Sequence, residues 1–257
     1  MSSTVLAGIV FVAAWAALAV VGFRLALRHR PRARDEAHND VYAVYFSMVG
    51  LLYAILLAFV VVVAWEQFNV ADEATHTEAT RLSNLLRDAE PLPADDRVRI
   101  QTAVVTYLEN VVDREYDAMA DGESDAQTTA AYEAIWDQYY RTKAHDEPAA
   151  TFFGSAVDRL NELGEARRLR LLSSQSTIPA PLWFLLIGGG LFTLAWLFPF
   201  HMADTRAQTL AIGTVGAFTG FVLFLIYALQ HPFSGDIAID TAVYDSLINQ
   251  WQGRISQ

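Results

Sequence analysis

The side chains in this 257-residue chain that could do chemistry are mainly carboxylates and histidines, because the chain contains no cysteine. Glu73-x-x-His76 has the spacing of half a di-iron carboxylate site, in which a glutamate and a histidine one helical turn apart bind metal. Such a site needs a second Glu-x-x-His, and none occurs among the six histidines. Glu115, Asp117 and Asp121 lie close in sequence, but an acidic helix surface is usually only solvated. The sequence therefore predicts no metal site and no cofactor.

Motifs for nucleophilic or phosphate chemistry are also missing. The chain has no Gly-x-Ser-x-Gly elbow, no Walker-type glycine loop and no Gly-x-Gly-x-x-Gly turn. Without cysteine there can be no disulfide and no cysteine nucleophile. We therefore predict no catalytic residue and no enzyme, and look to the elements of the fold for function.

Apolar residues make up 53% of the chain and charged residues only 18%, which is too much apolar surface for one small soluble core. Four runs are almost free of charge and reach the roughly 20 residues that a membrane span needs. The first run lacks the positive segment of a signal peptide, which favours an uncleaved anchor. The four runs are Thr4–Leu27, Val41–Trp65, Pro179–Phe200 and Leu210–Gln230.

The segment 66–178 holds most of the charge. It contains 22 acidic and 11 basic side chains, a balance of −11 that equals the net charge of the whole chain. A segment of this sign is a poor partner for nucleic acid. We therefore predict an all-α membrane protein with four transmembrane helices and a helical-bundle soluble domain inserted between spans two and three. Its parts are a transmembrane hairpin (1–65), the acidic domain (66–178), a second hairpin (179–230) and a C-terminal tail (231–257).

Helical periodicity and helix-stop signals divide the acidic domain into four pieces. No Gly or Pro occurs between Gly50 and Pro91, so the second span should continue as one helix through Glu90. A second helix is predicted from an apolar stripe at spacings of three and four that also includes Glu115. Ser124 with Gln127 predicts the capping box of a third helix. For a fourth helix, Asp146 is the predicted N-cap and Pro148 an early-turn proline, and its apolar stripe is Phe153, Val157, Leu160, Leu163 and Leu171.

Arginines in the first short loop predict the orientation, since positive charges in short loops stay on the cytoplasmic side. Alternation of the spans then places the acidic domain outside the cytoplasm, and we expect the protein in the plasma membrane. The arginines concerned are Arg24, Arg28, Arg30, Arg32 and Arg34.

Small residues recur on one face of span two and in span four, and such faces let helices in lipid approach closely. Either tight packing inside one subunit or contact between subunits would explain them. The residues that we assign to helix packing are Gly50, Ala54 and Ala58 in span two, next to Ala43 and Ser47, and Gly216 and Gly220 in span four.

Four sequence segments, taken together in their order along the chain, resemble the bestrophin-like family of bacterial membrane proteins. They are Leu51–Phe68, Thr75–Pro93, Ile178–Gly190 and His231–Gly235, and the most specific residues are Glu66, Glu78, Pro232, Phe233 and Gly235. The resemblance covers about Val41 to Ile239. It implies a four-span subunit distantly similar to bestrophins, which are oligomeric anion channels with an apolar neck lined by span two. This chain departs from bestrophins in lacking a calcium-binding acidic clasp.

Two hypotheses for the function follow. In the first, the chain forms a homo-oligomeric ion (anion) channel in the bilayer, with a span-two pore in which Phe59 and Val63 form an apolar constriction, Ser47 is a polar lining group and Glu66 tunes ion entry. Each of these side chains has a simpler interpretation as a lipid-facing or interfacial residue. In the second, the chain is a membrane-anchored interaction or sensing protein that uses its acidic bundle. Apart from Arg24 near the end of the first, the spans contain no charge, which weakens selection of ions by side-chain charge.

Overall fold

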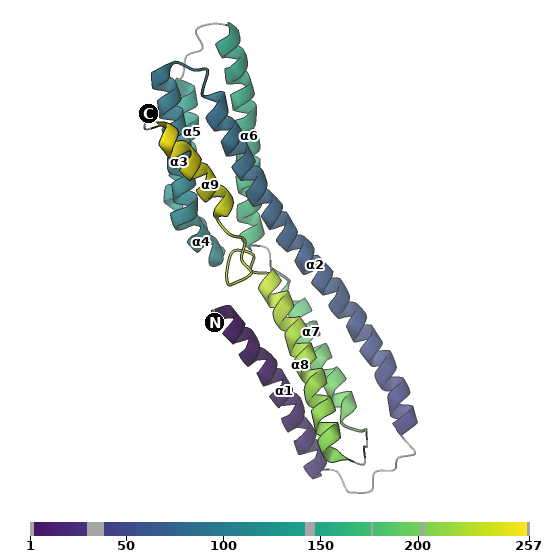
Figure 1. Ribbon diagram of the computed structural model, residues 1–257. Helices are drawn as coiled ribbons and strands as arrows, with labels where there is room; N and C mark the ends of the chain where they lie inside the picture. Colours follow the sequence, from purple (N-terminus) through teal and green to yellow (C-terminus); the bar gives the residue numbers. More distant parts are fainter. Residues whose placement is uncertain are drawn as a thin grey trace. The chain divides into compact units, whose positions relative to one another are not determined.

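The computed structural model describes residues 3–29, 39–141, 147–175, 177–200, 202 and 204–255. No strand occurs in these residues, and α1, α2, α7 and α8 are long and apolar enough to cross a membrane, which confirms the predicted all-α class and the four spans. The helices in chain order (Figure 1) are α1 Ser3–His29, α2 Asn39–Asp88, α3 Ala94–Asn110, the π-helix η2 Val111–Glu115, α4 Tyr116–Ala120, α5 Ala126–Arg141, α6 Glu147–Gln175, α7 Ala180–Leu197, α8 Thr205–Leu229 and α9 Ala242–Ile255.

The chain divides into two compact units. The first, here called the span unit, contains residues 1–66 and 177–230. The second, here called the bundle unit, contains residues 67–176 and 231–257. Helix α2 contributes to both, because it continues without a break from Asn39 to Asp88, as the absence of Gly and Pro after Gly50 predicted. The C-terminal residues, which the sequence suggested only as a tail, form α9 and belong to the bundle unit.

In the span unit, α1 packs closely along α8 through glycines of α8. A Cβ atom on Gly216 would lie 2.7 Å from the Cβ of Ala19, and one on Gly220 would lie 2.7 Å from the Cβ of Trp15. Real Cβ atoms do not approach so closely, so only glycine allows this contact between α1 and α8. The structure thus places these two glycines at a contact within one subunit.

Large aromatic side chains, rather than small ones, join α2 to α7. The Tyr53 ring lies over Gly189 and Gly190, where added Cβ atoms would meet the ring and its hydroxyl at 2.8 Å. The Tyr53 hydroxyl donates a hydrogen bond of 2.9 Å to the carbonyl oxygen of Leu186. Tyr45 stacks on Trp196 with 6.1 Å between ring centroids. Tyr53 marks the face of α2 that is buried within the subunit, whereas Tyr45 contacts Trp196 from another side of the helix and stays half exposed.

In the bundle unit, α2, α3, α5 and α6 alternate in direction around an apolar core, and η2 and α4 continue α3 (Figure 1). The C-terminal half of α2 contributes a stripe at helical spacing, and α3 packs against both α5 and α9. Fully buried members of this core include Leu82, Leu85, Leu86, Ile100, Val104, Leu108, Ile135, Leu160 and Leu163.

The start of α5 differs by one residue from the predicted capping box. Asp125, not Ser124, caps the helix: its Oδ2 accepts hydrogen bonds from the backbone N–H of Thr128 at 2.8 Å and from the Thr128 hydroxyl at 2.9 Å. The backbone hydrogen bond from Thr128 lowers the pKa of Asp125. Both residue types are good N-caps, so the sequence alone could not choose between neighbours. The predicted cap of the next helix, Asp146, lies outside the described residues, as do Arg30, Arg32 and Arg34 of the first loop.

We expect Asp125→Ala to lower the free energy of unfolding by about 1 kcal/mol, the usual effect of losing an N-cap. Asp125→Asn should retain most of the stability that the N-cap supplies, because an amide oxygen can accept the same hydrogen bonds. Because the folded-state pKa is lowered, the stabilisation is present above about pH 4 and is lost as the pH falls through that folded-state pKa. Thermal unfolding of the detergent-solubilised protein, followed by circular dichroism, measures this. Equal melting temperatures for the wild type and Asp125→Ala would contradict the assignment of the cap.

Candidate functional site

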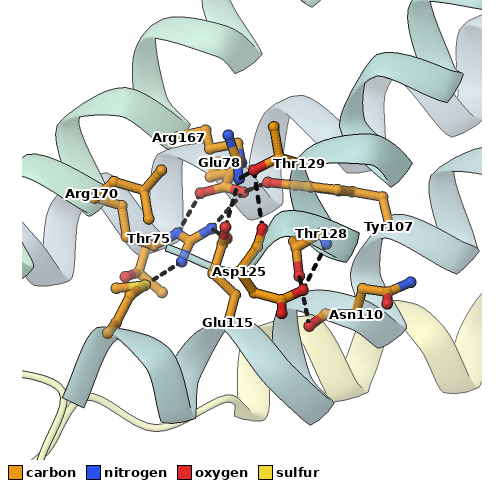
Figure 2. Close-up of polar contacts among 12 residues, drawn as sticks. Thr75, Glu78, Tyr107, Asn110, Glu115, Asp125, Thr128, Thr129, Arg167 and Arg170 are labelled. Atoms are coloured by element: carbon orange, nitrogen blue, oxygen red, sulfur yellow. Dashed lines mark hydrogen bonds and ion pairs between the residues drawn. The ribbon is translucent and has the colours of Figure 1, made fainter. Parts of the chain in front are cut away.

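The bundle unit encloses a group of fully buried charges. Arg170 of α6 lies between Glu78 of α2 and Glu115 of η2, and none of the three has exposed surface (Figure 2). The Arg170 guanidinium donates to Glu78 through Nε at 2.6 Å and through Nη2 at 3.2 Å, and to Glu115 through Nη2 at 2.5 Å. One guanidinium thus ties three helical segments together.

A second arginine balances the charge. Arg167, one turn before Arg170 on α6, donates from Nη2 to Glu115 Oε1 at 2.5 Å and to the Thr129 hydroxyl at 3.1 Å. Two guanidiniums face two carboxylates, so the group has no net formal charge. Burial of charge is tolerated when each ion is paired and hydrogen-bonded, as here. We call Glu78, Glu115, Arg167 and Arg170 the buried charge cluster.

Aromatic and sulfur-containing side chains complete the surroundings of the cluster. The Tyr107 hydroxyl donates to Glu78 Oε1, and Nη1 of Arg170 lies 2.7 Å from the sulfur of Met119. Burial, followed by the negative charge of Glu78, raises the pKa of Tyr107 well above its usual range, so this phenol stays protonated as a donor. Burial alone would lower the pKa of Arg170, but the attraction of Glu78 and other neighbours outweighs it and the pKa is raised.

A π-helical turn brings Glu115 to this place. Residues Val111–Glu115 form η2 between α3 and α4, and both of its end residues are buried. A π-turn rotates the helix relative to regular α-geometry, and such turns are frequent at functional sites. Next to it, the Thr128 hydroxyl oxygen lies 3.2 Å from the carbonyl oxygen of Asn110. The sequence analysis interpreted Glu115 as part of a solvated acidic surface. That interpretation is wrong, because Glu115 has no exposed surface.

The buried charge cluster is suited to structure rather than to reaction. Its two arginines and two glutamates pair with one another, and among the described residues only Nε of Arg167 in this cluster lacks a hydrogen-bond partner. Glu73 and His76 lie elsewhere on α2 and are exposed, with His76 Nε2 3.8 Å from Asp72 Oδ1. Among the described residues, no group of three His, Asp or Glu side chains could hold a metal ion.

The span part of α2 presents a different kind of surface, because little of it is covered by its own subunit. Only 6% of its most apolar window is buried, compared with 33% for α8, so α2 is the least covered of the four spans. Its exposed side carries a stripe at spacings of four and three, which is a regular helical seam. We call this stripe the α2 seam; its members are Met48, Leu52, Ile55, Phe59, Val62 and Glu66, all exposed.

The four pore-lining residues predicted from the sequence do not share one side of α2. Phe59 and Glu66 lie in the α2 seam, and Val63 lies at its edge; Phe59 is 69% exposed and Val63 47%. Ser47 lies about 120° round the helix from Phe59 at 100° per residue. Its hydroxyl already donates to the carbonyl oxygen of Ala43 at 2.8 Å, so it offers no free proton to a pore.

The predicted packing residues of α2 occupy a flank of their own. Ala54 and Ala58 are exposed, and a Cβ atom added to Gly50 would meet nothing within 4 Å. This flank lies between the α2 seam and the side that Tyr53 and Val60 bury against the rest of the span unit. The small-residue flank is therefore open over Gly50, Ala54 and Ala58.

The family residues after α8 form a turn on the bundle unit. Phe233 is buried against Tyr116, with an edge-to-face ring contact at 5.6 Å. Gly235 has a φ of +84°, which a residue with a side chain rarely adopts. The backbone N–H of Ile239 donates to the carbonyl oxygen of Pro232 at 2.8 Å and closes the turn.

Two members of the cluster, Arg167 and Arg170, were not predicted from the sequence. They continue the apolar stripe of α6, at four and seven residues after Leu163, and Glu115 likewise stands within the stripe of its own helix. A charged residue at a position that the periodicity assigns to the core is the signal that could have identified all three.

Residues 13–244 match the family of bestrophin-like domains. Among solved structures, the bacterial bestrophin homologue from Klebsiella pneumoniae has the same fold, with a TM-score of 0.70, 13% identity and coverage of 98% of this chain and 99% of that one. A variant of that homologue has a TM-score of 0.64, 15% identity and coverage of 99% and 100%. The comparison with curated proteins gives no match.

Proposed function

This chain belongs to the bestrophin-like family, and on that basis we propose that it forms a homo-oligomeric ion channel whose pore is lined by the α2 seam. The observation that carries the proposal is the exposure of α2. A span that its own subunit leaves almost uncovered, with a regular seam turned about 120° round the helix from the buried Tyr53, is suited to a ring of identical helices.

Three sides of α2 then have three roles. The Tyr53 side contacts α7 of the same subunit. The small-residue flank around Ala54 allows a neighbouring copy to approach closely. The α2 seam is left facing the axis. This division follows from the positions of the residues around one helix and requires no further element.

The pore so formed would be apolar for most of its length. Phe59, with Ile55 and Val62, forms a ring of apolar side chains that gates by dewetting, and Glu66 adds charge at one end. The family resemblance implies anions as the permeating ions, and the reversal potential in a salt gradient measures that selectivity directly. We also place the bundle unit outside the cytoplasm, on the ground of the arginines next to the first loop, and the protein in the plasma membrane.

Ion flux from liposomes that contain the purified protein tests the channel. We expect wild-type flux above that of empty liposomes and a larger flux for Phe59→Ser, because a hydroxyl in the narrow ring favours water there. Phe184→Ser is the matched control: Phe184 of α7 is also exposed, at 81%, but lies outside the α2 seam. Wild-type and Phe59→Ser proteins that both leave the liposomes impermeable would rule out conduction through this seam.

A further inference from the structure

A groove in the span unit runs between α1 and α8 and has no assigned role. Its volume is about 600 Å³. It lies at the last turns of α1 and the first turns of α8. The residues lining it are Val20, Arg24, Leu27, Thr205, Arg206, Thr209, Leu210, Gly213, Thr214 and Ala217.

The groove is polar at one end and apolar at the other. α1 and α8 are antiparallel, and Gly213 lies opposite Val20, where an added Cβ would be 3.2 Å from Val20 Cγ2. One turn nearer to the end of α1 and the start of α8, Arg24 lies level with Thr209. Arg206 lies beyond them. In the other direction the groove continues over Ala217. A ligand that fills it must have a polar end and an apolar end.

Two arginines, Arg24 and Arg206, lie at the polar end of the groove. Neither the Arg24 nor the Arg206 side chain has an ion pair or hydrogen bond within the described residues. The nearby carboxylate of Asp204 caps the N-terminus of α8, where its Oδ1 accepts from the backbone N–H of Arg206 at 2.8 Å. The Thr209 hydroxyl donates to the Thr205 carbonyl oxygen, so the two guanidiniums are the available donors.

We propose that this groove binds one anionic phospholipid, with the phosphate at Arg24 and Arg206 and an acyl chain along the apolar part toward Ala217. Two guanidiniums from different helices suit phosphate oxygens, which accept charged hydrogen bonds from arginine. A soluble phosphate would occupy only the polar end of the groove, whereas a lipid would fill its whole length. Basic pockets between membrane helices at the cytoplasmic side are typical sites for anionic headgroups.

Native mass spectrometry of the full-length protein, with phosphatidylglycerol or phosphatidylcholine added, tests the proposal. We expect one phosphatidylglycerol to be retained per chain and phosphatidylcholine to be lost. The double variant Arg24→Gln/Arg206→Gln should bind phosphatidylglycerol about thirtyfold more weakly, since each arginine near an anionic headgroup strengthens binding about fivefold. The matched control is Arg141→Gln/Arg168→Gln, which removes two exposed positive charges from the bundle unit.

Two further experiments distinguish a site for a lipid from a site for free phosphate. Ala217→Phe fills the apolar end and leaves both arginines in place, so it should also release phosphatidylglycerol. Glycerol phosphate, which has the headgroup chemistry without acyl chains, should not raise the melting temperature of the wild type at concentrations where phosphatidylglycerol does. The proposal is overturned if phosphatidylcholine is held equally well, if the double arginine variant binds like its control, if Ala217→Phe retains the lipid, or if glycerol phosphate stabilises as strongly as the lipid.

Discussion

Replacing Arg170 by methionine is expected to lower the free energy of unfolding by about 3–5 kcal/mol, because removing one partner of a buried pair leaves charge without compensation. Arg170 contacts both Glu78 and Glu115, and all three are without exposed surface. Methionine has a similar length and is apolar, so the lost volume is small. Thermal unfolding in detergent should show a fall in the melting temperature on the order of 10 °C.

Two further variants keep this prediction testable when Arg170→Met folds poorly. Arg168→Met is the matched control, since Arg168 is exposed on the same helix, and it should melt like the wild type. The double variant Glu78→Leu/Arg170→Met removes one positive and one negative charge and leaves the Arg167–Glu115 pair, at 2.5 Å, intact. It should regain much of the lost stability, because a buried ion pair can often be replaced by apolar residues. A double variant no more stable than Arg170→Met would show that unpaired charge is not the cause.

The buried charge cluster also shows where sequence reasoning about this fold succeeds and fails. The four spans and the long α2 could be predicted because charge-free runs and the absence of Gly and Pro act over many residues. Arg167, Arg170 and Glu115 stand in apolar stripes, which marks them as core positions, but their pairing could not be predicted because the partners are distant in sequence. The π-turn that brings Glu115 to Arg170 also has no sequence signal comparable with proline or glycine.

The residues of the proposed pore side of α2 could be anticipated from the sequence only in part. Phe59 and Glu66 were identified from their place in the span, and the structure locates both in the α2 seam. Ser47 was chosen for its polarity, but helical geometry places it on another side and its hydroxyl is bonded to Ala43. The remaining seam residues, such as Met48 and Leu52, could not be distinguished from other apolar residues. In a span that is apolar all round, composition does not reveal which side its own subunit covers.

The proposed homo-oligomer should dissociate when the small-residue flank of α2 is enlarged by Gly50→Leu or Ala54→Leu. Helices in lipid gain little from the hydrophobic effect against one another, so association depends on close contact that small side chains permit and large ones block. A Cβ on Gly50 meets nothing within 4 Å, and Ala54 is exposed, so neither leucine collides with its own subunit. We therefore expect chemical cross-linking of either variant to give fewer oligomer bands and more monomer than the wild type. Ion flux should be lost. The melting temperature of the monomer should stay close to that of the wild type.

Gly188→Leu is the matched control for this prediction. It places the same side chain in a different span, α7, at a position that is also open, so it should leave the cross-linking pattern unchanged. Gly216→Leu should behave in the opposite way and disrupt the subunit itself, because its Cβ would lie 2.7 Å from Ala19. If the wild type runs as a monomer in every detergent and is not cross-linked in membranes, α2 does not mediate assembly. If Gly50→Leu instead abolishes all folded protein, the flank is covered inside the subunit and the pore must be sought on another helix.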